Sequence, residues 1–138
     1  MSLTKEDLVL IREQLEGLRD ASHRDAERRR APRVRHSARV KMCRENQVHF
    51  GTTITVALHD ISDIGLGVFY DQPLKKGERF VITIENPGAP ALWVLCSVAR
   101  CQWWAEKTYL IGLRMLAMAD PFGRKKERDD GQIGRAHV

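Results

Sequence analysis

The chain has 138 residues, of which 43% are hydrophobic and 30% charged, a composition typical of one soluble globular domain. Its longest apolar run near the N-terminus, Leu8–Ile11, is too short for a secretion signal or a membrane span, so we expect a cytoplasmic protein. The net charge of +5 is unevenly distributed, because seven arginines lie between Arg24 and Arg39. Such a cluster favours an anionic partner: nucleic acid, a membrane surface or a phosphate-bearing small molecule.

Residues 1–27 are predicted to form an amphipathic helix and a linker. Thr4 can cap the helix, with Asp7 three residues later as an approximate capping box. One face carries a repeated set of apolar residues: Leu8, Ile11, Leu15 and Leu18. This face can pack on the chain's own domain, or it can form a short coiled-coil seam in a homodimer, although two heptads are few for a stable coil. The polar run 20–30 continues as frayed helix or linker, and Pro32 ends any helix.

From Val34 onward the apolar residues alternate with a period of two, which predicts β-strands. The first two strands are indicated by Ala38, Val40 and Met42, and by Ile54, Val56 and Leu58. Further β-rich runs cover residues 81–84, 92–98 and 109–116, and turn signals lie between them. Six short strands without intervening helices predict an all-β core, a six-stranded antiparallel β-barrel over residues 28–118.

Residues 119–138 are predicted to form a basic polar tail, either a short helix or an irregular end. The last six residues, 133–138, resemble the translation of a common sequencing adapter, ATC GGA AGA GCA CAC GTC. We therefore expect these six residues to be non-native and the native sequence to end near Gly131.

The sequence contains no constellation typical of a catalytic or metal site. His36, His49 and His59 have neither metal spacing nor a nucleophile partner, so we expect no enzymatic activity. The three cysteines are interpreted as reduced thiols in or near the core, with no structural metal: Cys43, Cys96 and Cys101. The three tryptophans are interpreted as core or barrel-surface packing, with base stacking as the alternative: Trp93, Trp103 and Trp104.

Two motifs lie on either side of the first predicted β-hairpin. The segment 28–33 contains R-x-x-x-R at Arg29 and Arg33, just before the first strand, and residues 60–65 read D-x-S-x-x-G, just after the second. Alone, the first motif is a solvated basic linker, and the second is a turn in which Gly65 takes a positive φ. Each motif alone is common, but their order and their separation by one hairpin make the two together a distinctive signature.

This arrangement resembles the PilZ domain family over about residues 27–116, and the continuation 66–68 and the strand at 111–113 are also similar. The resemblance implies a receptor or adaptor that binds the bacterial second messenger cyclic di-GMP, needs no other cofactor and acts on an unknown downstream protein. It implies six ligand-binding residues: Arg28, Arg29, Arg33, Asp60, Ser62 and Gly65. An arginine at position 28 is similar to family members that take up an intercalated ligand dimer, so two ligands per site are expected. The last strand carries Leu113 and Met115 where the family often has a phenylalanine, which affects core packing.

The residue types suit the ligand. A guanidinium can bond guanine O6 and N7 or fork onto a phosphate, and the Asp60 carboxylate can accept the guanine N1–H and N2–H₂ donors. Arg30 is interpreted as a solvated charge, whereas Arg100 either faces the ligand's outer base or lies free at the surface. Two alternatives stay open but less favoured: a basic barrel whose arginine-rich segment binds nucleic acid, and a degenerate PilZ fold that serves only as an interaction module.

Overall fold

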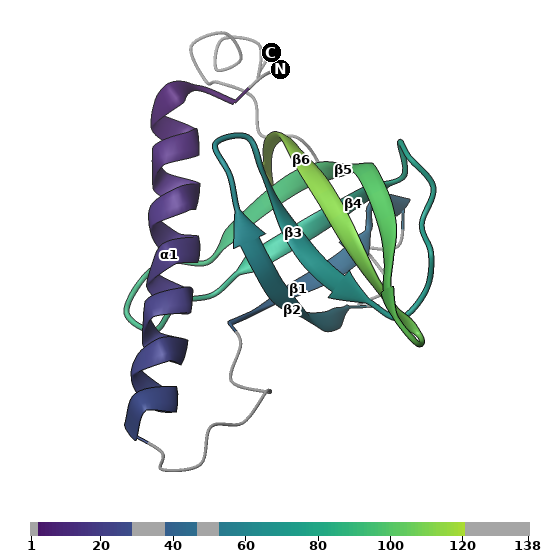
Figure 1. The fold of residues 1–138 in the computed structure, drawn as a ribbon. Helices are drawn as coiled ribbons and strands as arrows, with labels where there is room; N and C mark the ends of the chain where they lie inside the picture. The colour runs from purple at the N-terminus through teal and green to yellow at the C-terminus, as the bar shows by residue number, and fades with distance from the viewer. Residues whose placement is uncertain (1–2, 29–37, 47–52, 121–138) are drawn as a thin grey trace, which may run out of the picture.

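The computed structural model describes residues 3–28, 38–46 and 53–120, with residues 21–28 described as helical backbone (Figure 1). Within these ranges one helix precedes six strands: α1 (Lys5–Arg28), β1 (Arg39–Arg44), β2 (Ile54–Ile61), β3 (Gly65–Tyr70), β4 (Arg79–Ile84), β5 (Leu92–Ala105) and β6 (Thr108–Ala119). The strands close into a barrel in the order β1-β2-β3-β6-β5-β4, and every neighbouring pair is antiparallel. The predicted barrel is therefore confirmed, while residues 121–138 of the predicted tail lie outside the described residues.

The interior of the barrel is filled by the apolar residues that alternate along each strand. Phe80 on β4 is the largest of the fully buried side chains. It packs in one cluster with Leu113 and Met115 of β6, so the aromatic bulk that the last strand lacks is supplied from β4. The strand residues of this core are Val40, Met42, Val56, Leu58, Leu66, Val68, Phe80, Ile82, Ile84, Val94, Cys96, Val98, Ile111, Leu113 and Met115.

The hairpin of β5 and β6 is longer than the sequence pattern predicts. The strands were expected over 92–98 and 109–116, but they continue to Ala105 and begin at Thr108. Most of the added β5 residues are exposed, so they lack the buried-exposed alternation by which the other strands were detected. Lys107 closes the turn with a positive φ of 56°.

The predicted capping box starts the helix. The Asp7 N–H donates to Thr4 Oγ1 at 3.0 Å, and the Thr4 N–H donates to Asp7 Oδ2 at 3.1 Å. The apolar face of α1 packs against the core of the barrel. Ile11 and Leu15 are fully buried there, and Leu8 is partly buried beside them. Of the two alternatives for this helix, packing on its own domain is the one observed, and the apolar face is covered by the barrel.

The helix covers the end of the barrel that carries the β2–β3 and β4–β5 connections, and Figure 1 shows it beside the strands. Arg12 forms an ion pair with Asp63 of the β2–β3 connection. Asn86 of the β4–β5 connection donates from Nδ2 to the Gln14 carbonyl oxygen at 2.8 Å. Two connections of the barrel therefore hold one helix in place.

All three cysteines are free: Cys43 and Cys96 are buried and Cys101 is half-buried. Burial raises the pKa of the Cys96 thiol, and also that of Cys43, so both are poor nucleophiles at neutral pH. Within the described part of the chain, no helix has the length and apolar character needed to cross a membrane.

Replacing the buried helix residues tests the packing of α1. Leu15→Ala is expected to lower the free energy of unfolding by about 2–5 kcal/mol, because it leaves a cavity in the core. Val9→Ala on the exposed face of the same helix should change it by less than about 0.5 kcal/mol. Urea denaturation followed by circular dichroism measures both, and equal effects of the two substitutions would contradict the packing described here.

Candidate functional site

The D-x-S-x-x-G motif forms the connection between β2 and β3. The Ser62 N–H donates to the Gly65 carbonyl oxygen at 2.9 Å, and Ser62 Oγ donates to the same oxygen at 3.2 Å. The Met115 N–H donates to the Ile64 carbonyl oxygen at 2.9 Å, which ties the turn to β6. The turn is therefore closed by its own serine and held by a neighbouring strand, while the Ser62 hydroxyl oxygen keeps acceptor capacity.

Gly65 lies where two backbones come close together. The predicted positive φ is wrong: among the described glycines, Gly77 and Gly88 have that conformation, and Gly65 does not. A Cβ at Gly65 would instead overlap the Leu113 carbonyl oxygen of the paired strand. The close approach of two backbones, and not a positive φ, therefore disfavours a larger residue at this position.

A β-bulge places Asp60 on the outside of the barrel. Residues two apart in a strand face the same side, so Asp60 would otherwise share the interior with Leu58. The pairing of β2 with β3 shifts between Leu58 and Asp60, and His59 is the extra residue. Leu58 consequently stays buried opposite Val68, while Asp60 is exposed.

Asp60 begins a row of four residues that crosses four strands on the outer face. Asp60 pairs with Gly67, Gly67 pairs with Gly112, and Gly112 pairs with Arg100. A Cβ at Gly67 would overlap Asp60 Oδ1, and one at Gly112 would lie 3.0 Å from Arg100 Cγ and 3.3 Å from Arg100 Nε. The carboxylate and the guanidinium side chain therefore extend over bare backbone, and we call Gly67 and Gly112 the glycine pair.

The sequence alone assigns no site role to the glycine pair, and it leaves two alternatives for Arg100, facing the ligand or lying free at the surface. Glycine in the interior of a strand weakens it and often marks a place where a ligand or another backbone comes close. That signal was present at both positions, but only the register of β3, β6 and β5 brings the two glycines together.

The arginine segment is described only at its two ends. Arg28 is the last residue of α1, and its side chain, like the whole of Arg29 and Arg33, lies outside the described residues. At the other end, the Leu58 N–H donates to the Ala38 carbonyl oxygen at 2.8 Å, which fixes the chain beside β2 two residues before Asp60. Arg33 is five residues from Ala38, so the chain allows a separation of at most about 17 Å between them.

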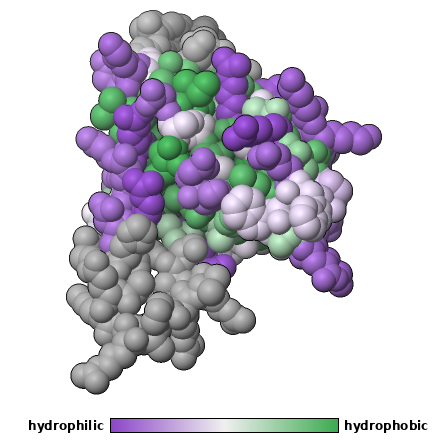
Figure 2. All heavy atoms as spheres, in the orientation of Figure 1, coloured by the Kyte–Doolittle hydropathy of each residue, from purple (hydrophilic) through white to green (hydrophobic). Residues whose placement is uncertain are grey.

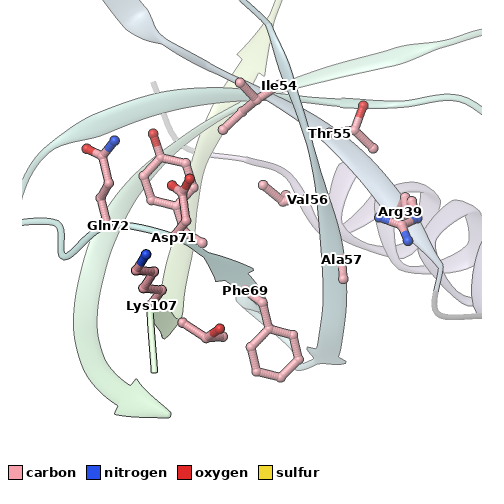
Figure 3. Close-up of a pocket in the computed structure, with 11 residues that line it drawn as sticks. Arg39, Ile54, Thr55, Val56, Ala57, Phe69, Asp71, Gln72 and Lys107 are labelled. Carbon is pink, nitrogen blue, oxygen red and sulfur yellow. The ribbon is translucent and has the colours of Figure 1, made fainter. Parts of the chain in front are cut away.

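A separate pocket of about 460 Å³ lies against the other end of β2 and β3 (Figure 3). Arg39, Thr55, Phe69 and Lys107 are among the residues that line it, whereas Asp60, Ser62 and Gly65 are not. The predicted motif therefore lies on an open outer surface of the barrel and not in this hollow.

The structure thus brings Asp60, Ser62 and Gly65 together in one hairpin and adds the glycine pair and Arg100 beside them. In comparisons with known proteins, a family model described as the PilZ domain matches residues 27–126, which is more than half of the chain and includes both motifs. No curated protein matches the chain.

Substitutions at two glycines of β3 distinguish a contact with backbone, at Gly65, from a contact with a side chain, at Gly67. Gly65→Ala is expected to lower the free energy of unfolding by about 1–3 kcal/mol, because the Leu113 backbone has to move. Gly67→Ala displaces only the end of the Asp60 side chain and should change the same quantity by less than about 0.5 kcal/mol. Thermal and urea unfolding of both variants would show this difference, and an equal loss in both would refute the contact assigned to Gly65.

Proposed function

The chain belongs to the PilZ domain family, whose members are cyclic di-GMP-binding adaptor modules, and on that premise we propose that it is a cyclic di-GMP receptor. In this proposal the arginine segment 28–33 and the turn 60–65 form one binding site on the outer face of the barrel. The observation that carries the proposal is the outward position of Asp60 against Gly67. Asp60 also lies two residues from Leu58, which bonds Ala38 at the C-terminal side of the arginine segment.

Asp60 supplies the part of the site that reads a base. An ionised carboxylate only accepts hydrogen bonds, and guanine presents N1–H and N2–H₂ donors on one edge. Gly67 is buried and Gly112 half-buried, because Asp60 and Arg100 lie against them, so the missing Cβ atoms let both side chains lie close to the sheet. A flat purine can then contact the carboxylate and the guanidinium together. A carboxylate in this position is unfavourable for a nucleic-acid phosphate backbone, which is why we prefer the cyclic dinucleotide to the nucleic-acid alternative.

The arginines supply the part of the site that holds the phosphates and the remaining base edges. Ordering about six residues of the segment costs on the order of 1 kcal/mol each, while a good bidentate contact contributes roughly 1–3 kcal/mol. Two contacts barely offset the ordering, but three contacts together with Asp60 exceed it. We therefore assign roles to Arg28, Arg29 and Arg33, and we propose two intercalated ligands per site.

Arg100 is added to the site on structural grounds. It lies at the opposite end of the row from Asp60, with the glycine pair between them. A guanidinium there can donate hydrogen bonds to the outer base or to a phosphate of a ligand that covers the two glycines. This position favours the ligand-facing alternative for Arg100 over a purely solvated charge.

The adaptor role follows from the position of α1. The helix runs directly into the arginine segment, and the Arg12–Asp63 ion pair connects it to the turn that carries Ser62. A ligand held by the segment and the turn would therefore act on the helix at two places, its C-terminal end and the Arg12–Asp63 ion pair. We propose that a cytoplasmic protein partner senses this helix, whose outer face exposes Val9 and Leu10.

Two arginines of the same segment provide a matched pair for testing the proposal. Arg33→Ala is expected to weaken cyclic di-GMP binding about tenfold or more, because a bidentate contact is lost. Arg30→Ala removes the same charge from a residue assigned no contact and should leave the affinity within about twofold. Isothermal titration calorimetry measures both, and the melting temperature of the free protein serves as a check on folding.

The same titrations also test the number of ligands. The unchanged chain is expected to bind two cyclic di-GMP molecules, and Arg28→Leu should lower this number toward one. Equal affinities of the Arg33 and Arg30 variants would remove the arginine segment from the site, and an unchanged stoichiometry for Arg28→Leu would exclude its role with the second ligand.

A further inference from the structure

Three aromatic rings pack together on the outer face of the barrel, and we call them the aromatic cluster: His59, Phe69 and Trp104. The His59 and Phe69 rings are stacked, with centroids 5.1 Å apart and planes 17° from parallel. Trp104 stands edge-on to both, at 5.2 Å from His59 and 5.1 Å from Phe69. The two contacts of Trp104 orient the indole ring, although 51% of the Trp104 surface remains exposed.

The aromatic cluster borders the glycine pair. His59 is the bulge residue immediately before Asp60, and Phe69 follows Gly67 by two residues on the same face of β3. Two residues along a strand correspond to about 7 Å, roughly the length of a purine ring system. Leu110, which pairs with Phe69, lies 3.5 Å from the position of a Cβ at Gly67, so the apolar surface continues up to the glycine.

The exposed half of the indole is suited to a flat ligand. The ring contacts with His59 and Phe69 already orient Trp104, so it loses little conformational entropy when a further ring stacks on its exposed surface. Figure 2 shows weakly polar residues gathered toward the free end of the β5–β6 hairpin, between more hydrophilic ones. Trp103 is adjacent in sequence and even more exposed, at 68%, but it takes no part in the three ring contacts.

We propose that the aromatic cluster stacks on a purine base of the cyclic dinucleotide and that Trp104 is a specificity-determining residue of the site. This inference rests on the proposed function, since Asp60 and the arginine segment bring the ligand to this face. Asp60 holds the edge of one base, and Trp104 presents its exposed surface to a base that extends beyond the glycine pair. The stack favours a purine over a pyrimidine, because a bicyclic ring covers more of the indole.

Adjacent tryptophans allow a controlled test. Trp104→Ala is expected to raise the dissociation constant for cyclic di-GMP about fivefold or more, because a stacking contact is removed. Trp103→Ala, which deletes an equally large exposed side chain next to it, should leave the constant within about twofold. Isothermal titration calorimetry with cyclic di-GMP gives both values, and Trp104→Phe should recover part of the lost affinity.

Fluorescence of chains that keep a single tryptophan gives an independent readout. With Trp93 and Trp103 replaced by phenylalanine, the emission of Trp104 should change on saturation with cyclic di-GMP. With Trp93 and Trp104 replaced, the emission of Trp103 should stay constant. If the unchanged chain fails to bind cyclic di-GMP, the proposed function fails and this inference with it. If the unchanged chain binds, but Trp104→Ala binds equally well or the Trp104 emission does not change, this inference alone is overturned.

Discussion

The β-bulge at His59 is the constraint on which the rest of the site depends. One extra residue in β2 allows a buried leucine and an exposed aspartate to stand two positions apart in the same strand. Without it, the Asp60 carboxylate would point into an apolar core, where an unpaired charge is strongly unfavourable. The bulge thus divides three successive side chains: Leu58 serves the core, His59 joins the aromatic cluster, and Asp60 enters the proposed binding surface.

Around this bulge, three glycines let other parts of the chain lie close to the barrel. Gly65 lets the turn lie against the Leu113 backbone, and the glycine pair lets the Asp60 and Arg100 side chains lie against the neighbouring strands. β3 and β6 are held together by continuous antiparallel pairing from Gly65 to Tyr70, so the proposed binding surface rests on a fixed strand register. Most of the arginine segment lies between α1 and Ala38, outside the described residues.

Local patterns in the sequence predicted the features that depend on local physics. The alternation around Val40 and Val56 predicted strands, and the Thr4–Asp7 pair predicted the start of the helix, because burial and capping depend on residues close in the chain. The contact of Gly65 with β6 and the approach of Arg100 to Gly112 could not be predicted in this way. Both depend on the register between strands that lie far apart in the sequence, and the bulge at β2 shifts that register without any distinctive residue.

The central claim is that the ligand lies over the glycine pair, and amide proton–nitrogen correlation spectra of the labelled protein test it most directly. Addition of cyclic di-GMP should shift the amide resonances of Gly67 and Gly112, because the bound base and phosphates lie against these backbone groups. The resonance of Thr83 on β4, the strand opposite β3 in the closed barrel, should stay in place. Ligand-dependent shifts elsewhere with Gly67 and Gly112 unmoved would contradict the account and place the binding site on another face.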